Sequence, residues 1–512
     1  MDQGTHCRTE RKVAVKGLIF DEPVIFEVGS PGRKAYSLPA LDVPEVEMEA
    51  LLPPEEVRGP IEHLPELAEL DVVRHYTRLS QWNFSIDTNF YPLGSCTMKY
   101  NPKINEDVAR LPGFSQHHPY APEAISQGSL QLLFELQEYL KEISGMDCVS
   151  LQPAAGAHGE FAGMLMVHAY HAGKGRPRHK VLMPDSAHGT NPASSALCGY
   201  EVVSIPSTAE GLIDIEKLAQ LMDEDTAAIM LTNPNTLGMF EKNILEIADI
   251  VHKKGGLVYC DGANLNAIAG VSRMGDMNVD VMHFNLHKTF STPHGGGGPG
   301  AGPVGIKNIL EPYLPTPVVE RHGSKYRLNY DRPQSVGKMR AFYGNFGILA
   351  RAYAYIRTLG PSGLRRACEG AVLNANYVKS RLQDDYHLPY PGPSLHECVF
   401  NDKEQSKRDV KTLDIAKALM DHGFHPPTVY FPLIVKGALM IEPTESESKE
   451  TLDQFVQAMK DIARQIETDP QSLHDAPLLP KISRPDEARA ARQPVLRWKP
   501  KSESVLIPGG RR

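Results

Sequence analysis

The chain has 512 residues, of which 41% are hydrophobic and 23% are charged, and its formal net charge is -8. This is an ordinary globular composition, and at roughly 150 residues per domain it predicts about two to four domains. Acidic and basic residues are mixed along the chain, which disfavours binding to nucleic acid or to an anionic membrane surface.

The seven cysteines are scattered and form no C-x-x-C pair. That pattern argues against a disulfide framework or a structural zinc site and favours a reducing compartment. No stretch approaches the roughly 18 consecutive apolar residues of a membrane span, and the N-terminus has no apolar core of signal-peptide length. We therefore expect a soluble, cytoplasmic protein.

The first part of the chain, residues 1–80, is rich in proline and glutamate. Frequent prolines disfavour long helices, so we expect an extended arm that either wraps a partner surface or forms a solvated tail. Residues 82–122 are rich in aromatic, hydroxyl, thiol and imidazole groups, which is typical of a functional loop. His117 and His118 suggest a metal, but adjacent residues point in different directions and no third ligand follows at a usual spacing, so we predict no metal site.

A large α/β domain is predicted over residues 81–335. Leu133, Leu136, Leu140 and Ile143 are spaced as one face of a helix, which Gly145 closes. From residue 148, short apolar runs alternate with helix-length segments, and this alternation predicts a mixed, mostly parallel sheet with helices on both faces. The apolar runs are 149–151, 181–183, 202–205, 229–231 and 257–259.

A smaller α/β domain is predicted over residues 336–468, followed by a Pro- and Arg-rich tail, 469–512, that is either disordered or laid on a neighbour. The domain contains two helical patterns, two short strands around a glycine turn and a last helix. Their ranges are 345–383, 412–422, 428–435, 438–443 and 446–467.

The segment from Asp280 to Phe290 is an apolar and aromatic run that contains His287 and Lys288. Burial lowers the pKa of a lysine amine, so a lysine at the end of a buried strand can act as a nucleophile and hold an aldehyde cofactor as a Schiff base. A lysine after a strand is more often a solvated strand end, and this alternative stays open for the segment taken alone.

Three other segments carry candidate cofactor contacts. The small residues Ala154 to Gly159 lie between a strand and a helix and suit a phosphate cradle, although close helix packing would select them too. His188 lies in a loop of small residues, where its ring could lie flat on a planar ligand or be an ordinary loop residue. Asp261 ends a hydrophobic strand, where it needs a partner such as a protonated ring nitrogen, an arginine or a helix N-terminus.

Together these groups supply the four attachments of pyridoxal phosphate, which acts as an electron sink. A competing motif, Gly300 to Gly305, fits G-x-G-x-x-G, but Pro303 removes an N–H that a dinucleotide loop would use. We therefore interpret the glycines from Gly295 to Gly302 as flexible backbone that closes the cofactor pocket.

Five strings resemble the glycine decarboxylase P-protein family, and the similarity extends over nearly the whole chain. The length is similar to that of the second subunit of the two-subunit bacterial form. The strings are residues 91–102, 152–160, 188–193, 233–238 and 285–290.

The resemblance implies an aminotransferase-like enzyme of fold type I that uses pyridoxal phosphate. It implies that Lys288 forms the Schiff base with the cofactor and that His188 stacks on the ring, so these two are the expected catalytic residues. It also implies that Asp261 pairs with the ring nitrogen and that Ala263 packs on the other ring face.

The resemblance further implies that Ala155, Gly156 and His287 lie near the phosphate and that Asn235 reaches the ring hydroxyl. The implied reaction is decarboxylation of glycine with transfer of the aminomethyl group to the lipoyl arm of the H-protein in the glycine cleavage system. The implied assembly is a heterotetramer with two copies of subunit 1 and two of subunit 2.

Two alternatives remain. The first is another fold-type-I pyridoxal phosphate enzyme, either an amino-acid decarboxylase or an aminotransferase. The second is a non-catalytic subunit that scaffolds its partner, which Lys288 and Asp261 argue against. A long lipoyl arm needs an open channel, and the 82–122 loop with Cys96, Lys99 and His118 is a candidate wall for it.

Overall fold

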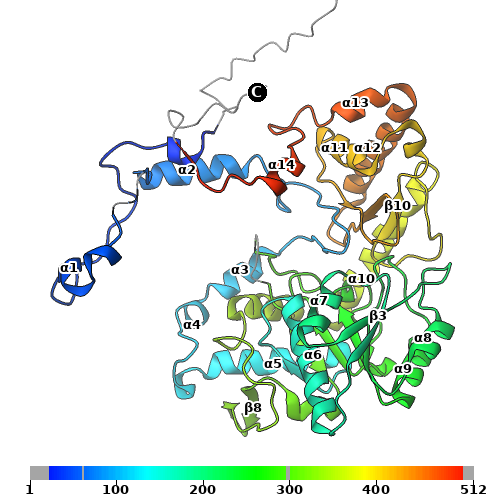
Figure 1. Cartoon of the computed structure of the whole chain (residues 1–512), viewed down its shortest axis with the longest axis horizontal. Helices are drawn as coiled ribbons and strands as arrows, with labels where there is room; N and C mark the ends of the chain where they lie inside the picture. Colours follow the sequence, from blue (N-terminus) through cyan, green and yellow to red (C-terminus); the bar gives the residue numbers. More distant parts are fainter. Residues whose placement is uncertain (1–21, 60, 62, 296–299, 500–512) are drawn as a thin grey trace, which may run out of the picture. The chain divides into compact units, whose positions relative to one another are not determined.

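The computed structural model describes residues 22–59, 61, 63–295 and 300–499 (Figure 1). These fall into two units, one from the segments up to residue 84 and from residue 480, the other from residues 85–479. We expected no long helix in the first unit, but α2 spans 12 residues, Glu69–Ser80. It can form because no proline occurs between residues 65 and 92. Its helical segments are η1 Ile25–Glu27, α1 Met48–Leu51, η2 Pro54–Glu56, α2 Glu69–Ser80 and α14 Glu487–Arg492.

The core of the second unit is a sheet of seven strands in the order β1-β7-β6-β5-β4-β2-β3. Strand β7 runs antiparallel to both its neighbours, and the other pairs are parallel. This confirms the predicted mixed, mostly parallel α/β sheet. The strands are β1 Cys148–Ser150, β2 Lys180–Pro184, β3 Glu201–Ile205, β4 Thr226–Thr232, β5 Leu257–Gly262, β6 Val281–Phe284 and β7 Val304–Ile306.

Helices cover both faces of this sheet because successive strand residues point to opposite sides. In β5, Val258 and Cys260 lie in a core shared with α5, α9 and α10, whereas Leu257 and Tyr259 lie in a second core shared with α6 (Figure 1). The predicted helix ending at Gly145 is confirmed, since Gly145 adopts φ 72° at its C-terminus. The helices are α5 Gln127–Ser144, α6 Gly156–Gly173, α7 Thr190–Leu197, α8 Ile215–Leu221, α9 Ile244–Lys253 and α10 Phe346–Leu382.

A smaller antiparallel sheet, in the order β10-β12-β11, follows the long helix α10, which Gly360 interrupts with φ 62°. Leu473 and Ala476 are buried in the core beside this sheet, so the chain stays packed beyond residue 469, where we expected the tail to begin. The elements are β10 Cys398–Asn401, β11 Thr428–Val429, β12 Ala438–Ile441, α11 Thr412–Asp421, α12 Lys449–Thr468 and α13 Pro470–Asp475.

The 82–122 segment contains two helices, α3 Lys103–Ala109 and α4 Pro112–Ser115, so its description as a continuous loop is wrong. Helix α3 packs against α10. This packing stabilises the helix although its sequence shows only weak helical periodicity. The remaining elements are a hairpin and short helical turns. They are β8 Val318–His322, β9 Lys325–Asn329, η3 Glu123–Ile125, η4 Leu265–Ala267, η5 Met274–Met277, η6 Asn308–Tyr313 and η7 Gln405–Arg408.

Among the residues that the structure describes, every helix is too short or too polar to serve as a membrane span.

Candidate active site

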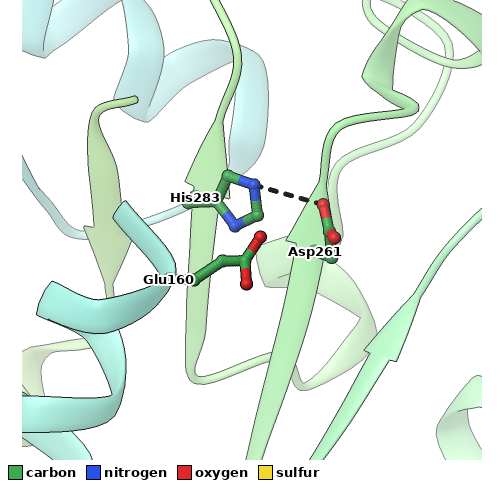
Figure 2. A group of neighbouring side chains, drawn as sticks. All are labelled: Glu160, Asp261 and His283. Carbon is green, nitrogen blue, oxygen red and sulfur yellow. Dashed lines mark ion pairs between the residues drawn. The ribbon is translucent and has the colours of Figure 1, made fainter. Parts of the chain in front are cut away.

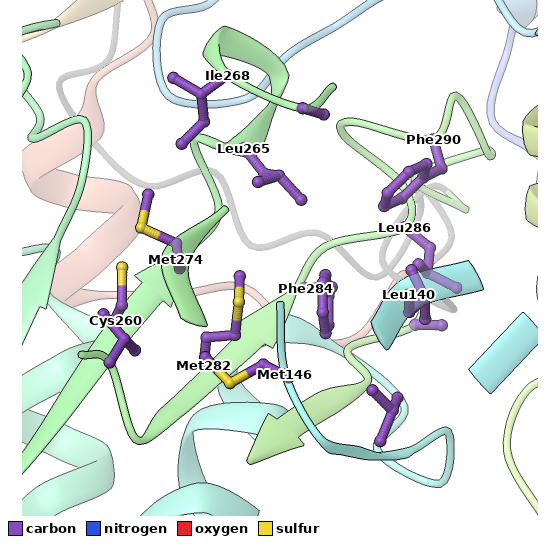
Figure 3. Close-up of a cluster of buried hydrophobic side chains, with 14 of the residues drawn as sticks. Leu140, Met146, Cys260, Leu265, Ile268, Met274, Met282, Phe284, Leu286 and Phe290 are labelled. Atoms are coloured by element: carbon purple, nitrogen blue, oxygen red, sulfur yellow. The ribbon is translucent and has the colours of Figure 1, made fainter. Parts of the chain in front are cut away.

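The turn that carries Lys288 follows β6 directly. The Lys288 N–H donates to the Asn285 carbonyl at 3.0 Å, and the Ser291 N–H donates to the Lys288 carbonyl at 3.2 Å. Leu286 and Phe290 on either side of the lysine are fully buried in the core below the turn (Figure 3). These two apolar anchors fix the backbone of a half-buried lysine at the carboxyl end of the parallel strands, where ligands of such sheets bind.

Asp261 lies on β5, opposite His283 of β6 in the strand register. His283 Nε2 is 3.2 Å from Asp261 Oδ1, and the Ala263 N–H donates to the same oxygen at 2.9 Å (Figure 2). Asn191 Nδ2 donates to Asp261 Oδ2 at 3.0 Å. Although burial raises the pKa of this carboxyl, His283 and the two hydrogen bonds outweigh it, so the pKa lies below its usual value and the group is a carboxylate.

His283 and Glu160 are site residues that the sequence analysis missed. The Tyr259 hydroxyl and His283 Nδ1 form a hydrogen bond of 2.9 Å, which orients the ring toward Asp261. Glu160 of α6 lies beside this pair and accepts from the Thr190 hydroxyl at 2.8 Å (Figure 2). The available signal was a histidine inside a fully buried strand, a position where a polar side chain must have a partner.

His188 is half-buried in the loop after β2. Its Nδ1 and the Thr190 hydroxyl form a hydrogen bond of 2.9 Å, and its ring meets that of Phe431 edge to face at 5.6 Å. Burial lowers the pKa of His188, with Lys288 adding to the effect and Asp261 opposing it. A neutral imidazole held in this way can lie against a flat ligand, and its role as the stacking residue stays a prediction.

The N-terminus of α6 is where we predict the phosphate cradle. Ala155 is exposed at the N-cap position, and Gly156 is buried at the first position of this 18-residue helix. A Cβ on Gly156 would lie 2.3 Å from Asn285 Oδ1, so only glycine fits against the lysine turn. The first N–H groups of a helix have no partner within the helix, so this end can accept a phosphate.

His287 lies in the lysine turn, directly before Lys288. Its ring packs edge to face on His294 at 5.0 Å, and a Cβ on Gly300 would lie 2.4 Å from His287 Nδ1. Burial lowers the pKa of His287 to about 3, so the ring is neutral. A neutral imidazole offers one donor and one acceptor, which suits a hydrogen bond to a phosphate oxygen.

The side-chain amide of Asn235 is hydrogen-bonded to backbone groups of its own turn and of Gly211. Its Oδ1 accepts from the Leu237 and Met239 N–H groups at 3.0 and 3.1 Å, and its Nδ2 donates to the Gly211 carbonyl at 2.8 Å. One amide hydrogen is left for a ligand. These bonds favour a supporting role, and the contact of Asn235 with the ring hydroxyl stays a prediction.

Unsatisfied buried polar atoms gather around Lys288. They have no hydrogen-bond partner among the described residues, which omit 296–299 and therefore most of the run from Gly295 to Gly298. Buried polar groups normally have partners, so a polar ligand with several donors and acceptors fits this space. The atoms are Asn285 Oδ1, His287 Nδ1, Thr289 Oγ1, Thr292 Oγ1 and His294 Nε2.

The three residues expected to line a channel lie in different surroundings. Cys96 lies near Lys288, whose charge acts on the thiol, although burial dominates and raises the pKa of Cys96. The ammonium of Lys99 is hydrogen-bonded to Glu445, and the residue is only 4% exposed. Lys99 therefore does not line an open channel. The ring of His118 packs on Phe342, and His117 is hydrogen-bonded to Ser126.

Two family models match the chain. Residues 159–298, which include most of helix α6 and the lysine turn, match the aminotransferase class-V model. Residues 367–477 match the model of the glycine dehydrogenase C-terminal domain. The first matched region ends just after the unsatisfied atoms around Lys288, and the second covers the whole of the smaller sheet together with α11, α12 and α13.

Similar sequences extend over almost the full length. A protein from Halalkalibacterium halodurans described as probable glycine dehydrogenase (decarboxylating) subunit 2 is 57% identical over 93% of this chain and 98% of its own length. A protein of the same description from Caldanaerobacter subterraneus subsp. tengcongensis is 56% identical over 93% of this chain and 98% of its own.

Solved structures share the fold. A glycine decarboxylase (P-protein) of the glycine cleavage system, in inhibitor-bound form, matches with a TM-score of 0.69 at 22% identity, over 81% of this chain and 95% of that one. A cysteine desulfurase from Thermococcus onnurineus NA1 matches with a TM-score of 0.58 at 16% identity, over 74% of this chain and 95% of that one. These likenesses confirm the expected fold type I.

Proposed function

Since the chain belongs to the family of glycine dehydrogenase (decarboxylating) subunit 2, we propose that it acts with a subunit 1 partner and passes the aminomethyl group of glycine to a lipoylated carrier, the H-protein. The chain is a pyridoxal phosphate enzyme of glycine cleavage. Two copies of each subunit form the proposed assembly, and the cysteine pattern supports a cytoplasmic location.

The observation that carries the proposal is the convergence of three groups at one edge of the sheet: the Lys288 amine, the Asp261 carboxylate and the N-terminus of α6. Lys288 would hold the cofactor aldehyde, and Asp261 the ring nitrogen. Bound pyridoxal phosphate supplies an electron sink for the pair of electrons left when the carboxylate departs as CO2. His188 and Ala263 would contact the two ring faces.

The chain's own residues orient these contacts. Asp261 Oδ1 is already engaged by His283 and Ala263, so Oδ2, with one partner in Asn191, is the oxygen that can accept from a protonated ring nitrogen. Its lowered pKa keeps it an acceptor and holds the proton on the nitrogen. The phosphate would lie at Ala155 and Gly156, within reach of the neutral His287 ring.

The test is exchange of the glycine carboxyl group with labelled bicarbonate, using the chain co-purified with subunit 1. We expect exchange that requires both subunits and the lipoylated carrier. The alternative, another fold-type-I decarboxylase or aminotransferase, would act on amino acids without the carrier. Carrier-independent turnover, or no exchange in the complete mixture, would contradict the proposal.

A further inference from the structure

A second group of buried ionisable side chains lies beside the lysine, outside the cofactor contacts described above. Glu397 precedes β10 and Glu442 follows β12, and because Cys398 and Ile441 are register partners, the two carboxyls lie at the same end of the small sheet. His396 Nε2 is 4.0 Å from Glu397 Oε2 and 3.8 Å from Glu442 Oε1. All three side chains are fully buried.

Residues 95–97, shortly before Lys99, are hydrogen-bonded to these carboxyls. The Ser95 N–H donates to Glu397 Oε2 at 2.8 Å. The Thr97 N–H and hydroxyl donate to the two oxygens of Glu442 at 2.8 and 2.5 Å. Ser95 and Thr97 both adopt left-handed backbone, with φ 63° and 50°, a conformation that non-glycine residues keep only when their surroundings enforce it.

The polar groups of this cluster are not all satisfied. Within the described part of the chain, both ring nitrogens of His396 and Oε1 of Glu397 lack a hydrogen-bond partner. Since buried polar atoms normally have partners, the cluster is built to receive an additional group. A proton placed between the two carboxyls or on the imidazole is the smallest group that meets this need.

Burial and the mutual repulsion of the two carboxylates favour a proton on this cluster. Burial raises the pKa of Glu442 to about 7 and, together with Glu442, raises the pKa of Glu397 well above its usual value. Burial lowers the pKa of His396 to about 3, with Lys288 adding to the effect. One polar atom from each of the three side chains lies within 4.8 Å of the other two, and two buried carboxylates this close repel each other, so a proton between them is favoured.

The other ionisable groups near the cluster do not supply that proton. Lys288 lowers the pKa of all three members and so opposes the proton, but burial outweighs this effect at both carboxyls. Cys96 has a pKa raised by burial, and burial lowers the pKa of His294 to about 4. Glu445 is paired with the Lys99 ammonium at 2.7 Å.

The proposed reaction needs one proton to be stored. Glycine enters as an ammonium carboxylate, and its nitrogen must lose a proton before it can attack. Later the C–C bond breaks to release CO2, its electron pair forms a C–S bond, and the S–S bond of the lipoyl group breaks with its pair on the other sulfur. That sulfur then takes up one proton, so the disulfide is the oxidant and the proton count balances.

We propose that His396, Glu397 and Glu442 form a proton reservoir that accepts the ammonium proton of glycine and returns it to the sulfur released from the lipoyl disulfide. This inference rests on the proposed function. The reservoir lies near Lys288, where the amine of glycine must arrive, and its two carboxyls are held in place by Ser95 and Thr97.

The test compares the wild-type chain, in complex with subunit 1, with Glu397→Gln and His396→Asn. In the infrared spectrum at neutral pH we expect a buried protonated carboxyl band that grows when glycine is added and that Glu397→Gln removes. We also expect Glu397→Gln to lower the rate of carrier-dependent bicarbonate exchange about 100-fold and to change its pH profile. His396→Asn, which leaves both carboxyls in place, should change the pH profile as well.

Glu241→Gln is the matched control, because Glu241 is also buried and bonded to backbone N–H groups, at Ile213 and Asn243, but lies outside the cluster. It should leave the band and the pH profile unchanged. If wild type shows no exchange, the proposed function fails. Three results would contradict the proton reservoir while leaving the proposed function intact. They are wild-type exchange without the band, a wild-type pH profile in Glu397→Gln, and a stoichiometric divalent metal bound to the cluster.

Discussion

Asp261 and His283 are register partners on neighbouring parallel strands, and His283 Nε2 lies 3.2 Å from Asp261 Oδ1. Because the Tyr259 hydroxyl holds the other ring nitrogen at 2.9 Å, three consecutive polar groups extend across the buried sheet toward the Lys288 turn. A hydrogen-bonded network of this kind fixes the position and charge of its last member. That member, Asp261, is the group that we propose to hold the ring nitrogen of the cofactor.

Asp261→Asn removes the charge while it keeps the side-chain shape. We expect the glycine–bicarbonate exchange rate to fall by about 100-fold or more, because an amide cannot hold a proton on the ring nitrogen. Asp280→Asn is the control, since Asp280 is likewise buried but bonds His252 and the Val258 N–H away from the site. Equal losses in the two variants would show that Asp261 acts only through folding.

Gly156→Ala tests the cradle. The added Cβ would lie 2.3 Å from Asn285 Oδ1, so the helix end and the lysine turn must separate. We expect the affinity for pyridoxal phosphate, measured by titration of the apoenzyme, to fall at least about tenfold, equivalent to roughly 1.4 kcal/mol. Gly128→Ala is the control, because a Cβ there meets nothing within 4 Å, and an unchanged affinity in Gly156→Ala would contradict the assignment.

Lys99→Ala tests the buried ammonium that ties the 82–122 segment to the large sheet. Lys99 Nζ donates to Glu445 at 2.7 Å and to the Thr289 carbonyl at 2.8 Å, next to Lys288. Removing one partner of a buried ion pair costs about 3–5 kcal/mol, which should appear in the free energy of unfolding by denaturant.

The exposed pair of Lys103 and Asp87, at 2.8 Å, provides the comparison for Lys99. Lys103→Ala should cost less than about 1 kcal/mol, because solvent screens the pair. Losses of similar size in Lys99→Ala and Lys103→Ala would mean that the Lys99 contacts add little to stability.

His252 gives a pH dependence of stability. The hydrogen bond to Asp280 raises the pKa of His252 above 6.5, although burial opposes it. A raised pKa in the folded state contributes stability below about pH 6.5, and this stability is lost as the pH rises through the folded-state value. Wild type should therefore exceed His252→Gln in unfolding free energy by more at about pH 6 than at about pH 8.5. A constant difference would contradict this.

Local patterns of neighbouring residues predicted the fold, which is confirmed, and the segments expected to hold the cofactor, which stay a prediction. The stripe of Leu133, Leu136 and Leu140 and the apolar run before Lys288 each determine one element, and both are confirmed. The resemblance to a known family added the expected roles. Helices α3 and α4 were not predicted because their sequences have little helical periodicity. Helix α3 packs on α10, and Phe114 of α4 contacts Phe346 of α10.

The site residues that the sequence did not reveal were missed for a different reason. His283 and Glu160 meet Asp261 only after a helix and two strands are brought together (Figure 2). His396 and Glu442 are 46 positions apart and become neighbours through the pairing of β10 with β12. Such contacts depend on strand register, which no short segment specifies. Lys99 was misread for the same reason, since its partner Glu445 is 346 positions away.

The most direct test of the account is to locate the cofactor on the chain. Reduction of the holoenzyme with borohydride, followed by proteolysis and mass mapping, should place the pyridoxyl group on the peptide that contains Lys288. Lys288→Ala should then carry no reducible cofactor, while Lys307→Ala, which alters a lysine bonded to Asp147 away from the turn, should label as wild type does. A pyridoxyl group on any other lysine of the wild-type chain would contradict the account.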